Sequence, residues 1–172
     1  MQLKSVSLAF ALSLSFLAGC STLPIPENGI PHNAVAVYSW QGEGRTIFRC
    51  AYDAEGFFWE FVGTEGTLHT DAGRHTADLT GRFDVLAGDG GLLKANIISQ
   101  SEGKSSRDLK TAEFVAQPPA SGILQGVRWM RRTAATGGMP LAGCSASQRG
   151  ALLRVPFRAR YVFYRAASAA IH

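Results

Sequence analysis

The sequence predicts an all-β domain, either an antiparallel β-sandwich or a barrel-like sheet, with short helices or turns between its strands. Stretches in which side chains alternate between two faces are common, whereas helical periodicity is hard to find beyond the first 33 residues. The run FFWEFV at 57–62 is rich in aromatic residues, which favour strands. The 19 glycines lie mostly between such runs, which is typical of short strands joined by tight turns.

The elements can be placed along the chain from these patterns. The predicted strands are 46–52, 57–62, 83–86, 92–99, 127–133 and 158–165. Residues 53–56 have the composition of a hairpin turn, and so does the glycine-rich segment 87–91. Short helices are expected around 105–113 and within 142–151.

The first 19 residues have the features of a bacterial export signal. Lys4 precedes an apolar run at 6–16, which is shorter than the about 20 residues that a permanent membrane helix needs. The segment ends in Leu-Ala-Gly-Cys, which resembles the lipobox of bacterial lipoproteins. This resemblance implies cleavage before Cys20 and lipid attachment to its thiol. An ordinary secreted protein, in which Cys20 pairs with another cysteine, is the alternative.

The expected organisation is a signal peptide at 1–19, a lipidated and proline-rich tether at 20–33, and one β-rich domain at 34–168. Two acyl chains on Cys20 would give stable membrane anchoring. Ser21 follows the lipid site, where an Asp would retain an enterobacterial lipoprotein in the inner membrane. We therefore expect a cell-envelope protein anchored at the outer membrane, facing the periplasm or the cell surface.

The two remaining cysteines are expected to form a disulfide. If Cys20 carries lipid, Cys50 and Cys144 are the only pair available in an oxidising compartment. Two free buried thiols are the alternative. Neither residue has a Cys or His at metal-ligand spacing, and neither has a His close by in sequence that would indicate a catalytic thiol.

Charge is distributed unevenly along the chain. All 13 acidic residues lie between Glu27 and Glu113, and the segment from Phe114 to His172 contains none. That segment carries eight arginines: Arg128, Arg131, Arg132, Arg149, Arg154, Arg158, Arg160 and Arg165. They could form a surface for anionic lipid, lipopolysaccharide or nucleic acid. We favour ion pairing between basic C-terminal strands and acidic N-terminal strands of one sheet, and the export signal argues against nucleic acid.

Several segments resemble one protein family. They are GEGRTIFRC, FFWEFV, LHTDAGRH and GDGG, followed by GVRWMRRTAATGGMP, the Gly-Cys at 143–144 and VPFRARYVFYR. Together, over 35–165, they resemble the bacterial and fungal family called domain of unknown function 3455. The resemblance implies a secreted all-β domain without an established activity. The sequence departs from the family at 76–83, where a Gly-Pro-Thr-Trp segment is expected and Phe83 stands in place of the Trp. It also departs at 108–117, where an apolar segment is expected; these departures indicate a divergent member.

Polar residues offer few candidates for chemistry. His69, Asp71 and His75 could supply two imidazoles and a carboxylate to a metal, but a polar loop explains them equally and is favoured. Asp89-Gly90 is expected to form a tight turn. Gly137-Gly138 should also form a turn, or else a backbone-amide nest for an anion, flanked by Arg131 and Arg132.

The tryptophans and tyrosines allow an aromatic sugar platform, although Trp59 and Trp129 are expected to be core residues. Sequence signatures of serine hydrolases, zinc proteases and phosphate loops are missing.

The favoured function is a non-enzymatic lipoprotein whose β-domain binds a ligand or partner, such as an anionic or carbohydrate component of the envelope. No cofactor and no metal is expected. The candidate ligand-binding residues are His75, Asp89, Arg131, Arg132, Gly137 and Gly138. One alternative is an envelope hydrolase or other enzyme that uses His75 with Asp71 or Asp89. The other is a structural envelope component.

Overall fold

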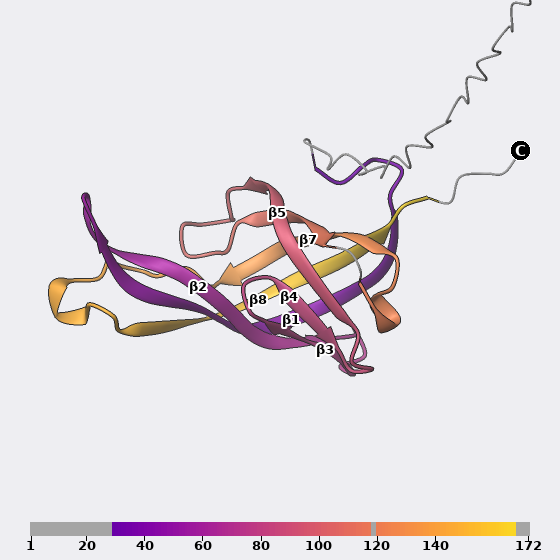
Figure 1. Ribbon diagram of the computed structural model, residues 1–172, viewed down its shortest axis with the longest axis horizontal. Helices are drawn as coiled ribbons and strands as arrows, with labels where there is room; N and C mark the ends of the chain where they lie inside the picture. The colour runs from indigo at the N-terminus through magenta and orange to yellow at the C-terminus, as the bar shows by residue number, and fades with distance from the viewer. Residues whose placement is uncertain (1–28, 118–119, 168–172) are drawn as a thin grey trace, which may run out of the picture.

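The computed structural model describes residues 29–117 and 120–167, which form one closed antiparallel barrel (Figure 1). Each strand pairs with the next in sequence, and the last strand returns to pair with the first. The strands are β1 (Val35–Asp53), β2 (Gly56–His69), β3 (His75–Thr80), β4 (Asp84–Ala87), β5 (Leu92–Ser101), β6 (Thr111–Gln117), β7 (Val127–Gly137) and β8 (Leu152–Arg165). The predicted all-β class is confirmed, whereas the signal peptide, Cys20 and most of the tether lie outside the described residues.

Two predicted turns join strands as expected. The first connects β1 to β2, and there the Asp53 carboxylate accepts a hydrogen bond from the Glu55 amide at 2.9 Å. The second connects β4 to β5, where Asp89 accepts from the Gly91 amide at 3.0 Å. Gly90 has a φ of +82° in this turn, a conformation that glycine adopts without a steric penalty.

The segment 105–113 is not a helix, and that prediction was wrong. Its last residues begin β6, in which Ala112, Phe114 and Ala116 point into the barrel and their neighbours point outward. This alternation buries one face of a strand, and a helix would scatter the same side chains around its axis. The second expected helix, within 142–151, is a single 3-10 turn, η2 (Ala146–Gln148). A second such turn, η1 (Gly122–Leu124), precedes β7.

Within the described ranges, no helix has the length and apolar character to cross a membrane.

The barrel interior is a packed apolar core over most of its length. Trp40 on β1 is 4% exposed and packs against Phe163 on β8, with ring centroids 4.7 Å apart. Gly42, also on β1, leaves room for a neighbour, because a Cβ there would lie 2.6 Å from the Tyr161 ring. The prediction that Trp59 and Trp129 belong to the core was wrong, since both are only half-buried and lie outside it.

Part of β1, β2 and β8 extends well beyond the other strands (Figure 1). We call this extension, residues 49–60 with 140–153, the fin. The predicted disulfide joins Cys50 to Cys144 within it, with a Cα–Cα distance of 5.9 Å. Trp59 adds a second link, since its Nε1 donates to the Ala142 carbonyl at 3.1 Å. The β7–β8 connection is thereby fastened to the β1–β2 hairpin.

The favoured interpretation of the charge pattern is confirmed by ion pairs between strands. On the outer face, β8 arginines meet acidic residues of the β1–β2 region: Arg154 with Glu65 at 3.4 Å, Arg158 with Glu43 at 3.5 Å, and Arg160 with Asp71 at 3.2 Å. These pairs are exposed, so each contributes little stability. They account for three of the eight C-terminal arginines, each of which meets an acidic residue from the N-terminal half of the sequence.

Candidate functional site

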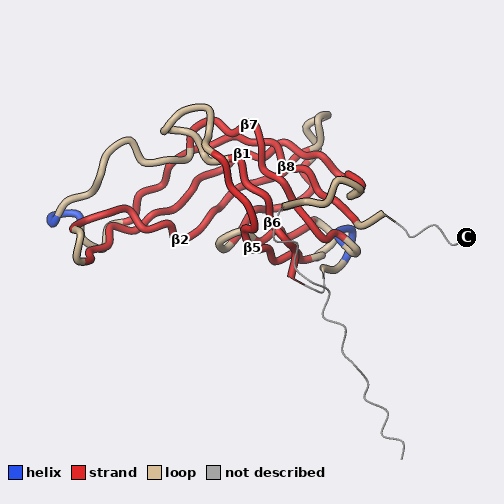
Figure 2. Tube along the Cα trace, turned by 90° about the horizontal axis from the view of Figure 1, so that it is seen from above, coloured by secondary structure: helices blue, strands red, loops and turns tan. Residues whose placement is uncertain are grey.

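The barrel has two different ends. Because neighbouring strands are antiparallel, the β1–β2, β3–β4, β5–β6 and β7–β8 connections meet at one end, which we call the mouth. The start of β1 and the end of β8 lie at the other end, with the remaining connections. In Figure 2 the fin projects from the mouth and carries η2 at its tip. Segments far apart in sequence therefore converge at the mouth.

A cavity of about 200 Å³ opens at the mouth. Six apolar side chains line it: Phe48, Phe61, Phe83, Ile97, Leu109 and Met139. The other lining residues are Thr46, Gln100, Lys110 and Arg132. The lining thus combines a largely apolar surface with a few polar groups, which is typical of small-molecule sites in barrel mouths. It contains two cationic side chains and no carboxylate.

One wall of this cavity is a row of phenylalanine rings. Phe48 of β1 meets Phe61 of β2 edge-on at 5.9 Å, and Phe61 stacks on Phe83 at 5.5 Å. Phe83, in the β3–β4 turn, contacts Phe114 at 5.3 Å. These centroid distances lie in the range of favourable aromatic contacts. The row leads from the fin down to the packed core at Phe114.

Arg132 on β7 lies at the base of the cavity and is only 7% exposed. Its Nε and Nη2 donate to the Lys110 carbonyl at 3.3 and 3.1 Å, and its guanidinium lies 5.7 Å from the Phe114 ring centroid. The Tyr161 side chain faces it from β8. Burial raises the pKa of the Tyr161 phenol, and the adjacent guanidinium offsets part of that rise.

The neighbouring Arg131 points the opposite way, as alternation along a strand requires. Its guanidinium pairs with Glu113 at 2.6 Å and lies over the Tyr164 ring. Glu113 also accepts a hydrogen bond from the Ile30 amide at 3.0 Å. Of the two arginines predicted to flank an anion site, only Arg132 faces the cavity.

The Gly137-Gly138 segment binds an anion that belongs to the chain itself. Both glycines have positive φ, and the Gly137 amide donates to the Asp108 carboxylate at 2.7 Å. This hydrogen bond, together with one from Ser105, lowers the pKa of Asp108. The Gly138 carbonyl accepts from the Thr46 hydroxyl. These groups therefore fix the β7–β8 side of the mouth, and Asp108 occupies the amide predicted to receive a ligand.

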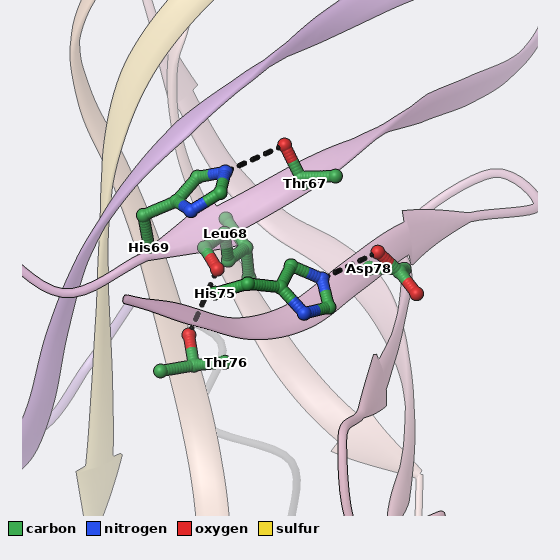
Figure 3. A network of polar contacts seen from close by, with 6 residues as sticks. All are labelled: Thr67, Leu68, His69, His75, Thr76 and Asp78. Carbon is green, nitrogen blue, oxygen red and sulfur yellow. Dashed lines mark hydrogen bonds and ion pairs between the residues drawn. The ribbon is translucent and has the colours of Figure 1, made fainter. Parts of the chain in front are cut away.

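The histidine cluster lies where β2 ends and β3 begins, at the end of the barrel opposite the mouth. Figure 3 shows its contacts. His75 Nε2 contacts the Asp78 carboxylate at 2.8 Å, and His69 Nε2 contacts the Thr67 hydroxyl at 2.9 Å. The two imidazole rings are 5.6 Å apart. Asp71 instead pairs with Arg160 on β8. Within 29–117 and 120–167, no three His, Cys, Asp or Glu side chains come together as a metal site would require.

The acids proposed to act with His75 have other partners. Asp89 accepts from the Ile123 amide at 2.7 Å as well as from Gly91, so it fastens the β4–β5 turn to η1. An open groove beside the cluster is lined by His69 and Asp71 but not by His75. The structure therefore does not bring His75 together with Asp71 or Asp89 in the arrangement that the enzyme alternative needs.

Sequence reasoning missed most of the cavity, because its lining comes from seven separate segments. One signal was available for Arg132, which follows Met130 by two residues and so shares the inward face of β7. A lone arginine on an apolar strand face indicates a charge inside the barrel. No protein-family model, curated protein sequence or solved structure matches this chain.

Proposed function

We propose that this protein is a lipid-anchored envelope protein whose barrel mouth binds a small, mainly apolar molecule. The observation that carries the proposal is the cavity of about 200 Å³ with its six apolar lining side chains. A cavity of about 150 Å³ is large enough to bind benzene in another protein. The mouth cavity is therefore of a size to hold a ligand of similar or slightly larger volume.

The position of the cavity also fits the proposed anchor. β1 starts at Val35, at the end opposite the mouth, and reaches the cavity lining at Phe48, about 40 Å further along the strand. An anchor at Cys20 would therefore attach the end of the barrel that is far from the cavity. The mouth and the fin would face away from the membrane and remain accessible to a ligand.

The resemblance noted in the sequence adds a further argument. The chain departs from the pattern of domain of unknown function 3455 at 76–83 and at 108–117, and each segment contributes to the cavity lining through Phe83, Leu109 or Lys110. Divergence that reaches the lining of a site is what a changed ligand would produce. This supports a binding function with a ligand of its own.

The binding function can be tested with 1-octanol as a neutral probe in isothermal titration calorimetry of the purified chain. If six methylenes of the probe are buried at about 0.8 kcal/mol each, the binding free energy is favourable by about 5 kcal/mol. This corresponds to a Kd of about 0.2 mM. Ile97→Trp places a bulky ring in the cavity and should weaken binding at least tenfold. Leu86→Trp, on the exposed outer face of β4, is the matched control and should bind normally. Equal binding by both variants would place the ligand elsewhere.

The anchor is tested separately by Cys20→Ser. In a bacterial host, this variant should move from the membrane fraction to the soluble envelope fraction, because the thiol that carries the lipid is missing. Retention of the variant in the membrane fraction would contradict the lipid-anchor proposal. It would leave the binding proposal untouched, since that rests on the cavity.

A further inference from the structure

The most unusual group in the barrel is the Arg132 side chain. The residue as a whole is 7% exposed, so more than nine-tenths of its surface is removed from water. Arginine keeps its proton in proteins, so this position carries a full positive charge at any ordinary pH. Buried charges are costly unless an opposite charge compensates them.

Asp84 lines the same small pocket as Arg132 but forms no ion pair with it. The groups that contact the Arg132 side chain are neutral. They are the Lys110 carbonyl, the Phe114 ring and the Tyr161 side chain. Because burial raises the pKa of Tyr161, its phenol stays protonated and supplies no negative charge. Among the ion pairs of residues 29–117 and 120–167, none joins Arg132 to a carboxylate, whereas the adjacent Arg131 has Glu113 at 2.6 Å.

Among the described residues, no acidic side chain lines this cavity. Its second cation, Lys110, pairs outward with the exposed Glu102 at 2.9 Å. An anion that entered the cavity would meet a desolvated guanidinium at its base, where the attraction between charges is stronger than at a protein surface. The Lys110 carbonyl engages one N–H on Nε and one on Nη2 of Arg132. The donors on Nη1 and the second donor on Nη2 are left for a carboxylate, which two N–H groups of the planar guanidinium can bind together.

We propose that the mouth binds an apolar monocarboxylate, with its carboxylate on Arg132 and its hydrocarbon part along the phenylalanine row. This inference rests on the proposed binding function and names the chemical class of its ligand. The cavity volume of about 200 Å³ is about one-third larger than the 150 Å³ that holds benzene, which suits a hydrocarbon part of roughly eight carbons. A longer chain would have to leave through the open mouth.

The test compares octanoate with 1-octanol, which have the same chain length and differ in charge, on the purified chain by calorimetry. Octanoate should bind at least tenfold more tightly. Equal or tighter binding of 1-octanol would overturn the carboxylate assignment and leave the binding function standing. Absence of binding by both probes would overturn the binding function, and the carboxylate assignment with it. This comparison uses the unaltered protein, so it does not depend on the folding of any variant.

A pair of variants then locates the charge. Arg132→Met should weaken octanoate binding at least tenfold and change 1-octanol binding less than threefold. Arg131→Met, the same substitution one residue away on the outer face, should leave both affinities within twofold. Unchanged octanoate binding by Arg132→Met, or an equal loss in both variants, would overturn the role of Arg132.

Discussion

Removing the disulfide between Cys50 and Cys144 should lower the free energy of unfolding by about 4–5 kcal/mol. The bond joins residues 94 apart in sequence. On the chain-entropy model, closing a loop of this length lowers the conformational entropy of the unfolded chain by about 16 cal/mol/K. This destabilises the unfolded state by about 4.7 kcal/mol at 25 °C. We expect the folded barrel to survive this loss, because the residues of its hydrophobic core lie outside the fin.

The perturbation is the double variant Cys50→Ala/Cys144→Ala, which leaves no unpaired thiol in the domain. Urea unfolding followed by tryptophan fluorescence gives the free energy and its dependence on urea. With a slope of about 2 kcal/mol/M, the midpoint should fall by about 2 M. The slope should also rise, because the unfolded chain without the cross-link is more expanded and exposes more surface.

A matched control comes from the same loop. Leu141 is 75% exposed and three residues from Cys144, so Leu141→Ala should change the free energy of unfolding by less than about 0.5 kcal/mol. A loss below about 2 kcal/mol in the cysteine variant, with an unchanged slope, would refute the chain-entropy reasoning. It would mean that the unfolded chain is already restricted in this region.

Two further predictions concern stability. Asp108→Asn removes the carboxylate that accepts a hydrogen bond from the Gly137 amide. The pKa of Asp108 is lowered in the folded state, so the ionised carboxylate stabilises the unaltered chain relative to the variant. This stability difference should be full above pH about 4 and decline as the pH falls through the lowered pKa. Thermal unfolding at pH 6 and pH 3 measures this difference, and a larger gap at pH 3 would contradict it. Phe163→Ala removes a ring that is 0% exposed and should cost about 3–5 kcal/mol in urea unfolding. Leu86→Ala is the control at an exposed position. Similar losses of unfolding free energy in both variants would contradict the assignment of Phe163 to the core.

The sequence was sufficient to predict the local elements of the fold but not the way they close. Hairpin turns at 53–56 and 87–91 follow from glycine and aspartate in positions where the backbone must reverse. The pairing of β1 with β8 joins residues as distant as Val35 and Arg165, and no local pattern specifies which strands become neighbours. The alternation of inward- and outward-facing side chains along the strands was therefore consistent with both a sandwich and a barrel.

The candidate site shows the same division between local and distant information. Asp89-Gly90 was correctly predicted to form a turn, because the residues that determine it are adjacent. Arg131 and Arg132 were predicted together, and only the alternation of β7 separates their roles, one on the surface and one inside. The enzyme alternative required His75 near Asp71 or Asp89, but His75 pairs with Asp78, which is three residues along the same strand.

The pairing of the first strand with the last has a consequence for the time order of folding. A chain that emerges from its N-terminus, from a ribosome or through a membrane pore, presents β1 with one edge unpaired until β8 has also emerged. Such an edge can pair with another chain, and contacts between distant residues form slowly. During synthesis, the edge of β1 therefore stays unpaired for a time and can pair with other chains. In a chain truncated before Leu152, which lacks β8, this edge would stay unpaired permanently.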